Sequence, residues 1–183
     1  MKLKILLLLS LLAVSCKKET KTEIETPKVL KDSTPISLKQ TEIQEEDTIV
    51  ISKKHQTNKI LCDLDGDGLN ETVEIVRGIK SNKSGLRIIF GNKKRTDYLG
   101  MGKDIVGQGF DEIDWAGIFE KAPKNEIYYN NVNEDGEIIG EEEVKEEDKI
   151  KLLNDGIFIH AEESCGGGII YLNNGKYNWI QQE

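Results

Sequence analysis

Three aspartates at alternate positions are the residues of this chain best suited to do chemistry. Residues 62–76 read CDLDGDGLNETVEIV, in which Asp63, Asp65 and Asp67 are followed directly by Gly68. Calcium takes about six to eight hard oxygen ligands. Alternate carboxylates on a tight loop point to the same side while the intervening residues face outward. The spacing therefore predicts a calcium loop.

The expected ligands follow from position in this loop. With Asp63 at the first position, Glu71 is the ninth and Glu74 the twelfth, as in the pattern D-x-[DN]-x-[DN]-G-x5-E. The alternative is an acidic turn that binds no metal, but close carboxylates repel one another unless a cation neutralises them. The predicted ligand set consists of side-chain carboxylates and one backbone carbonyl, that of Leu69: Asp63, Asp65, Asp67, Leu69, Glu71 and Glu74.

The segments on either side of the loop decide what it connects. After it, residues 72–76 alternate with a period of two, which places Val73 and Ile75 on one face of a strand. The segment before it, TNKIL, has no helical apolar stripe. The sequence thus predicts strand–loop–strand, with Glu71 as the last ligand on the loop and Glu74 on the opposite face from Val73 and Ile75.

CDLDGDGLNETVEIV resembles the calcium loop of FG-GAP and VCBS-type modules, which occur in integrin-like β-propellers and bacterial surface proteins. In those modules a D-x-[DN]-x-[DN]-G-x-x-[DE] loop joins two strands. The resemblance covers one copy, so it implies a calcium loop and no complete propeller. The chain is also similar to small bacterial surface lipoproteins that end in an aromatic hairpin, here GIIYLNNGKYNWIQQE, and this similarity implies no activity.

The first residues are typical of an export signal. Lys2 and Lys4 precede an apolar stretch, residues 5–14, which is too short for the roughly 20 residues that cross a bilayer. Small residues then lead to Cys16, and this arrangement resembles a bacterial lipobox. The resemblance implies cleavage after residue 15, a lipid on Cys16, and a place in the cell envelope, at the outer membrane or cell surface. Leu12 lies four places before the cysteine instead of three, so release by ordinary signal peptidase is the alternative.

Composition divides the remainder into two parts. Residues 16–47 are rich in Lys, Glu and Thr, with Pro27 and Pro35, and bury too little apolar area to fold, so we expect a flexible tether. Residues 48–183 form one β-rich domain, because their apolar runs are short, β-branched or aromatic and are separated by Asn, Gly and Asp. The class is mainly β, with α+β as the alternative, since 110–120 could form a short helix. The expected strands are 47–52, 72–76, 86–90, 126–129, 156–160, 168–172 and 176–180, the last two joined as a hairpin by Asn174-Gly175.

The net charge argues against two kinds of partner. The formal net charge is −8, and about −10 once the two leader lysines are removed, which argues against nucleic acid and against electrostatic binding to anionic lipid. We expect the membrane to be contacted through the lipid alone. In an oxidising compartment Cys62 and Cys165 can form one disulfide, and two unpaired thiols are the alternative.

The expected function is a non-catalytic, calcium-stabilised binding or accessory module, with a glycan, a peptide or an envelope protein as partner. Phe110, Trp115 and Phe119, beside acidic residues, could line such a groove. A subunit role in a surface complex is one alternative. Another is a surface hydrolase, for which the clustered candidates are His160, Glu162, Glu163 and Cys165.

A second stretch, residues 131–142, imitates the calcium pattern. Its ninth position is Ile139, whose side chain cannot bind a metal, so a hairpin turn around Asp135-Gly136 explains the stretch more simply.

Overall fold

The structure is a computed structural model that describes residues 47–133, 135–163 and 166–183. These residues belong to one compact unit, Gln44–Glu183. The predictions for the leader, for lipidation of Cys16, for most of the tether and for Cys165 lie outside the described residues. Among the residues described, no helix is long and apolar enough to cross a membrane.

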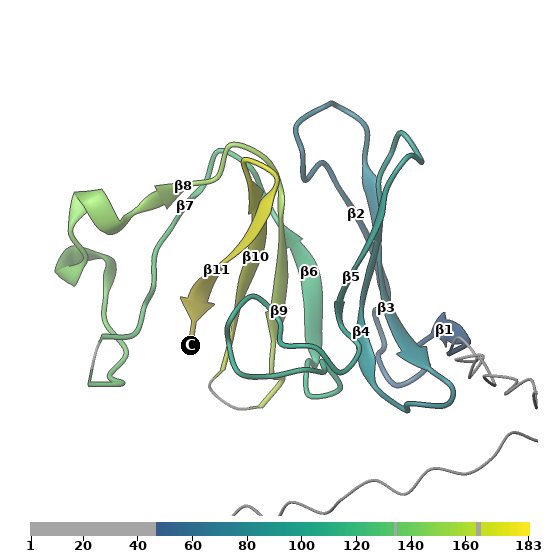
Figure 1. The fold of residues 1–183 in the computed structure, drawn as a ribbon. Helices are drawn as coiled ribbons and strands as arrows, with labels where there is room; N and C mark the ends of the chain where they lie inside the picture. The colour runs from purple at the N-terminus through teal and green to yellow at the C-terminus, as the bar shows by residue number, and fades with distance from the viewer. Residues whose placement is uncertain (1–46, 134, 164–165) are drawn as a thin grey trace, which may run out of the picture. The chain divides into compact units, whose positions relative to one another are not determined.

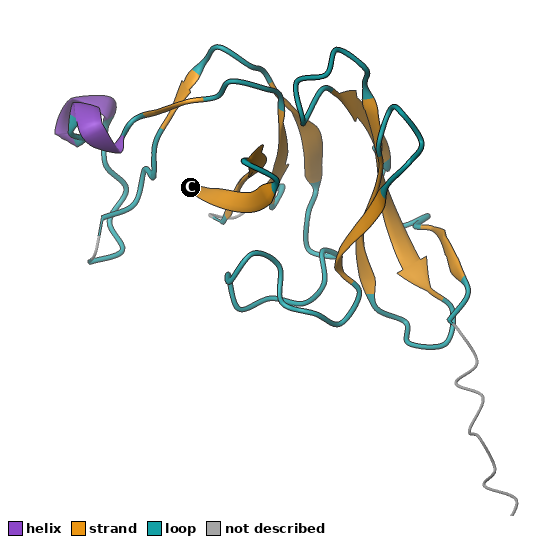
Figure 2. Cartoon of the chain, turned by 45° about the horizontal axis from the view of Figure 1, so that its top comes forward, coloured by secondary structure: helices purple, strands orange, loops and turns teal. Residues whose placement is uncertain are grey.

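The described residues form antiparallel strands and two short 3-10 helices, so the mainly β class is confirmed (Figure 1). Residues 110–117 are irregular, with a turn at residues 114–115, and a strand follows at Ile118 in place of the helix considered for 110–120. Figure 2 shows both 3-10 helices in one excursion of the chain. The elements are β1 (Ile49–Ile51), β2 (Lys59–Cys62), β3 (Glu71–Gly78), β4 (Ser84–Ile89), β5 (Thr96–Gly100), β6 (Ile118–Ala122), β7 (Ile127–Tyr128), η1 (Glu141–Glu143), η2 (Glu146–Asp148), β8 (Ile150–Lys151), β9 (Gly156–His160), β10 (Gly167–Asn173) and β11 (Lys176–Gln182).

Two main sheets carry the fold (Figure 1). In the first, the order is β1-β3-β4-β5, and β2 also pairs with β3. The long strand β3 takes β2 along its first half and β1 along its second. In the second sheet the order is β11-β10-β9-β6, while β7 and β8 form a separate ribbon. All of these pairs are antiparallel, as hairpin-type connections require.

One hydrophobic core is shared by the two sheets. Period-two alternation sends Val73 and Ile75 of β3 into it from the first sheet, and Ile157 and Ile159 of β9 from the second. Each fully buried aliphatic side chain of this kind contributes roughly 1.5–3 kcal/mol of transfer free energy. Ile113, from the loop before β6, closes the core at one side.

The opposite face of the second sheet carries a smaller core. Ile169 of β10 and Ile180 of β11 are buried there with Ala122 and Leu152. The predicted hairpin is confirmed: β10 and β11 pair throughout, and Asn174 and Gly175 take φ values of 49° and 77° at its turn. Positive φ at both turn residues is what a two-residue hairpin with the twist of the strands needs.

The first described residue is already part of the fold. Asp47 accepts hydrogen bonds from the backbone N–H groups of Lys80 (2.7 Å) and Ser81 (3.1 Å), in the turn between β3 and β4. The Ser81 hydroxyl also donates to Asp47, at 2.5 Å. This side-chain bond lowers the pKa of Asp47 the most, and the two backbone N–H groups lower it further. Asp47 is therefore fixed against the turn between β3 and β4.

Candidate functional site

The acidic loop joins β2 to β3 as the sequence predicts. The two strands pair antiparallel, and Cys62 opposite Glu71 is the last pair before the loop opens. Gly66 and Gly68 take φ values of 78° and 82°, a region that glycine enters without strain. The strand–loop–strand arrangement is confirmed, and no helix of the described chain flanks the loop.

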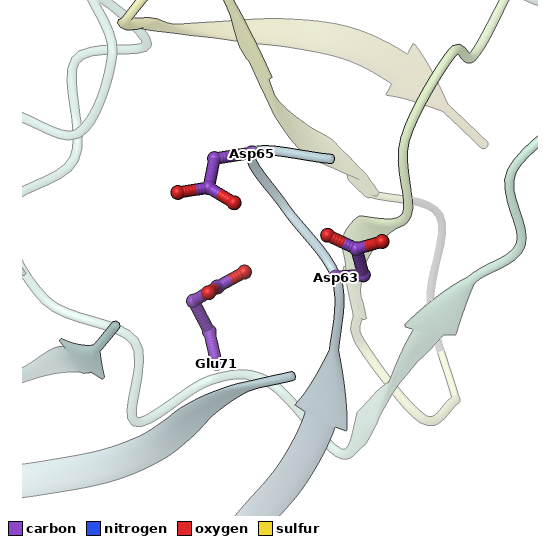
Figure 3. Close-up of side chains that lie close together, drawn as sticks. All are labelled: Asp63, Asp65 and Glu71. Carbon is purple, nitrogen blue, oxygen red and sulfur yellow. The ribbon is translucent and has the colours of Figure 1, made fainter. Parts of the chain in front are cut away.

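Three carboxyl groups gather at this loop (Figure 3). Asp63 and Asp65 come from the loop and Glu71 from the first residue of β3, and one oxygen of each lies within 4.8 Å of the others. Two oxygens bound to one calcium at about 2.3–2.6 Å lie at most about 5 Å apart. The group of three is therefore compact enough to hold a single metal ion.

Glu71 is the most unusual member of the group, because its carboxylate is fully buried. One oxygen accepts the N–H of Leu64 (2.5 Å) and the other the N–H of Gly91 (3.2 Å). Burial raises the pKa of Glu71 despite these two bonds, and the charges of Asp65 and Asp67 raise it further. No lysine or arginine of the described chain forms an ion pair with Glu71. A buried carboxylate of this kind is costly unless a cation compensates it.

Asp63 has one cationic neighbour. Its Oδ2 atom lies 3.3 Å from the Nζ atom of Lys124, while its Oδ1 atom accepts the N–H of Gly66 at 2.9 Å. Lys124 is about half exposed, so its charge is partly screened. One lysine beside three carboxylates leaves two negative charges when all are ionised, and this balance suits a divalent cation.

Asp67 and Leu69 form the exposed tip of the loop. The Asp67 carboxylate accepts the N–H of Leu69 at 2.7 Å, and Asp65 accepts the N–H of Asp67 at 3.1 Å. These local bonds are Asx turns, which stabilise a tight loop without help from a metal. Asp67 does not join the group of three, and Leu69 could contribute only its backbone carbonyl.

Glu74, expected as the ligand at the twelfth position, is placed elsewhere. Its carboxylate accepts two hydrogen bonds from the Arg87 guanidinium, at 3.0 and 2.6 Å, and lies 3.9 Å from the Nζ atom of Lys59. β3 runs on straight from Glu71, so three more residues carry Glu74 along the strand and away from the loop. The structure therefore puts Glu74 in an ion-pair network on the sheet, and Glu71 ends the acidic loop.

A distant turn holds the loop in place, and the turn-like residues LLNDG are the only sign of it in the sequence. Asp155 accepts the N–H of Asp63 at 3.1 Å, and its own N–H donates to the Asp63 carbonyl at 2.9 Å. Burial raises the pKa of Asp155, but the N–H groups of Asp63 and Lys124, together with the Lys121 ammonium, lower it by more, so its pKa lies below the usual range. The ionised Asp155 is thus a structural anchor for Asp63, the first residue of the acidic group.

Gly66 provides a matched test of this anchoring. A Cβ atom at Gly66 would lie 2.5 Å from the Oδ1 atom of Asn154, whereas one at Gly68 would meet nothing within 4 Å. Both glycines have positive φ, so alanine at either should cost about 1–2 kcal/mol. Gly66→Ala should cost about 1 kcal/mol more, because it displaces the Asn154 amide that donates to the Leu64 carbonyl at 3.3 Å. Denaturant titrations of both variants measure the difference, and equal losses would show that the Asn154 contact contributes nothing.

Cys62 lies beside the loop as a fully buried residue with a free thiol. Burial raises its pKa to about 12, so this thiol is protonated at neutral pH. Its expected disulfide partner, Cys165, lies outside the described residues. Cys62 lies near Asp155, which directly precedes β9. Glu163 and Gly166, the described residues on either side of positions 164–165, come after the last residue of β9, His160. The disulfide stays a prediction.

The hydrolase candidates show no assembled catalytic group within the described residues. The Nδ1 atom of His160 lies 2.6 Å from the Ala161 carbonyl, and its ring stacks on Phe158 with centroids 5.8 Å apart. Glu162 and Glu163 are exposed, and neither forms a hydrogen bond or an ion pair with His160 in the described part of the chain.

The stretch that imitates the calcium pattern folds as the simpler interpretation expects. Val132 and Ile138 form an isolated bridge, and Asn133 accepts the N–H groups of Asp135 (3.0 Å) and Glu137 (2.9 Å). Among the described residues, the acidic loop is the only group of metal-binding side chains that gathers this closely.

Comparison with known proteins finds no relative: the chain matches no family model, no curated protein and no solved structure. The description of this protein therefore rests on its own fold and site. It has an antiparallel β-sandwich whose β2–β3 loop carries three carboxylates that could hold a metal ion.

Proposed function

We propose that this protein is a calcium-stabilised binding module held at the cell envelope by a lipid on Cys16. The observation that carries the calcium part is the buried Glu71 carboxylate, which has two other carboxylates within 4.8 Å and no ion-pair partner among the described residues. A bound cation would remove the cost of burying that charge.

The chemistry of the donors favours calcium. All three gathered side chains offer hard carboxylate oxygens, which suit calcium, magnesium or manganese, and none offers the imidazole or thiolate that zinc and copper prefer. Calcium tolerates the irregular geometry of a loop, whereas magnesium demands a near-ideal octahedron. Extracellular modules bind calcium at roughly 10⁻⁴–10⁻³ M, so the ion would be structural and not a signal.

Calcium would act by joining two parts of the fold. Asp63 is already tied to the turn before β9 through Asp155, and Glu71 begins β3. An ion between them would fix the β2–β3 hairpin against the second sheet. At ten times its dissociation constant, one such ion stabilises the folded state by about 1.4 kcal/mol.

Melting curves test the calcium part. The full chain, purified in a mild detergent and treated with a chelator, should melt higher when calcium is restored, and Asp65→Ala should lose most of that rise. Asp65 is exposed, so its replacement should leave the chelated protein nearly as stable as the parent. If calcium at a concentration several-fold above about 1 mM left the melting temperature unchanged, the calcium proposal would be wrong.

The lipid anchor is tested separately through Cys16. In a bacterial host, Cys16→Ala should move the protein from the detergent-soluble membrane fraction to the soluble exported fraction, and metabolic labelling with a fatty acid should stop. A parent protein that takes up no fatty acid would contradict the anchor and leave the calcium proposal untouched.

A further inference from the structure

An uncharged aromatic pocket of about 370 Å³ lies away from the acidic loop. Its walls come from the loop before β6, from Ala161 and Gly166 on either side of the undescribed residues 164–165, from the start of β10 and from the last strand. Of the three aromatic residues expected to line a groove, Phe110 and Trp115 do so, but Phe119 is buried in the core and Trp179 of β11 takes its place. The lining residues are Gln108, Phe110, Trp115, Ala161, Gly166, Gly167, Trp179 and Gln181.

Both tryptophan rings contact the Phe110 ring edge-on. Trp115 meets it at 88° with centroids 5.3 Å apart, and Trp179 at 68° and 5.7 Å. Each indole N–H is already used, since Trp115 donates to the Glu112 carbonyl at 3.0 Å and Trp179 to Gln181 at 2.9 Å. The tryptophans therefore offer a ligand their apolar faces and edges, and not their N–H groups.

The polar groups of the pocket are amides. Gln108 donates to the Val106 carbonyl at 3.2 Å, and its own amide oxygen accepts no hydrogen bond from the described residues. That oxygen is a neutral acceptor at the rim. Although the chain carries a net charge of −8 and its residues are 32% charged, none of the described residues that line the pocket is charged. A charged ligand would lose its hydration here without finding a partner.

The loop that carries Phe110 and Trp115 is fixed before any ligand arrives. Asp114 pairs with Arg77 of β3 and with Lys54 (2.6 Å), so this acidic residue of the loop is held by cations that do not line the pocket. The Ile113 N–H donates to the Ser84 hydroxyl at 3.0 Å. A wall held in this way loses little conformational entropy on binding.

We propose that this pocket binds a neutral pyranose ring of a glycan. A pyranose presents a flat array of C–H groups, which packs on aromatic faces, and an equatorial rim of hydroxyl groups, which donate to amide oxygens such as that of Gln108. The uncharged lining, the two indoles with occupied N–H groups and the free amide oxygen each match one part of such a ring. The inference deepens the proposed binding role by naming its ligand class, and it does not depend on the calcium site.

A peptide fits these observations less well. Grooves that read proline-rich segments combine aromatic walls with donors for the backbone carbonyls of an extended chain. The indole donors of this pocket are occupied, so a peptide would bury carbonyl groups without partners.

Binding of defined sugars tests the proposal. The full chain, in a detergent without a sugar headgroup, is titrated with cellotetraose, maltotetraose, mannotetraose and chitotetraose while tryptophan fluorescence and saturation-transfer NMR are recorded. At least one sugar should bind saturably, with a dissociation constant at or below about 1 mM. Because ligand and lining are neutral, the affinity should stay unchanged when salt is raised.

Three variants locate the site. Trp115→Ala should weaken binding at least about tenfold and Gln108→Ala a few-fold. Tyr98→Ala, which removes an exposed aromatic ring on β5 outside the pocket, should change nothing. Saturable binding that Trp115→Ala leaves intact would overturn the proposal, as would saturation by a polyproline decapeptide with no response to any sugar.

The same samples test the calcium proposal separately from the sugar proposal. Each titration is run with calcium and with a chelator, and melting curves are recorded for both. Sugar binding without a calcium-dependent shift in melting temperature would support the proposal for the pocket and contradict the calcium proposal. A melting shift without sugar binding would do the reverse.

Discussion

Glu71→Gln is expected to abolish the calcium-dependent rise in melting temperature and to lower the calcium-free free energy of unfolding by about 1–3 kcal/mol. The two oxygens of Glu71 accept from two different backbone N–H groups, those of Leu64 and Gly91. A glutamine has one acceptor oxygen, so its NH₂ group would face one of these donors in a fully buried place. The variant also removes the carboxylate that β3 contributes to the acidic group. Chemical denaturation and melting curves, each with and without calcium, measure both effects.

Glu74→Gln is the matched control, because it makes the same replacement three residues along β3. Glu74 is also buried, but its partners are Arg87 and Lys59. This variant should lose stability through the weakened ion pair and should keep the full calcium-dependent rise. A calcium response that Glu74→Gln removes and Glu71→Gln retains would contradict the assignment of Glu71 and restore the twelfth-position ligand.

Asp114→Asn is expected to lower the free energy of unfolding at pH 7 by about 1–2 kcal/mol. Burial raises the pKa of Asp114, but Lys54 and Arg77 outweigh that effect and bring it to about 2, below the ordinary 3.8. A carboxylate with a depressed pKa stabilises the fold fully above its unfolded pKa, and this contribution is lost as the pH falls through the folded value. The difference between parent and variant should therefore be constant above about pH 5 and shrink between about pH 4 and pH 2.

Asp111→Asn is the control for that experiment. Asp111 pairs with Lys83 at 2.9 Å, but both side chains are about 40% exposed, so the loss should be about 0–1 kcal/mol. Urea titrations across pH for the parent and both variants isolate the Asp114 contribution from the other carboxylates. A difference for Asp114→Asn that persists unchanged to pH 2 would show that its ion pairs are not the cause.

Several features of the fold could be predicted from the sequence because they depend on neighbouring residues. The pair Asn174-Gly175 predicted the turn between β10 and β11, because these two residue types readily adopt the positive φ that both show in the structure. The alternation of Val73 and Ile75 distinguished a strand after the acidic loop from a helix. Strands such as β5 (TDYLG) and β6 (IFEKA) were missed, because they mix polar and apolar residues and are recognisable only through their partners.

The candidate site shows the same limit. The spacing within the loop pointed to Asp63, Asp65 and Glu71, and the alternation after the loop placed Glu74 on the following strand. Glu74 nevertheless stayed in the expected ligand set, because its partners Arg87 and Lys59 come from the strands that pair with β3. Asp155, 92 residues from Asp63, became visible only when the fold brought the two together. Trp179 reached the aromatic pocket for the same reason, through the pairing of β10 with β11.

Anomalous scattering from crystals grown with calcium chloride would locate the calcium ion proposed between Asp63, Asp65 and Glu71. We expect a single strong peak about 2.3–2.6 Å from a carboxylate oxygen of each of these three residues. Crystals of Glu71→Gln, grown under the same conditions, should lack that peak. Absence of density at the loop in the parent protein, or a peak only on the exposed acidic residues of η1 and η2, would contradict the calcium proposal.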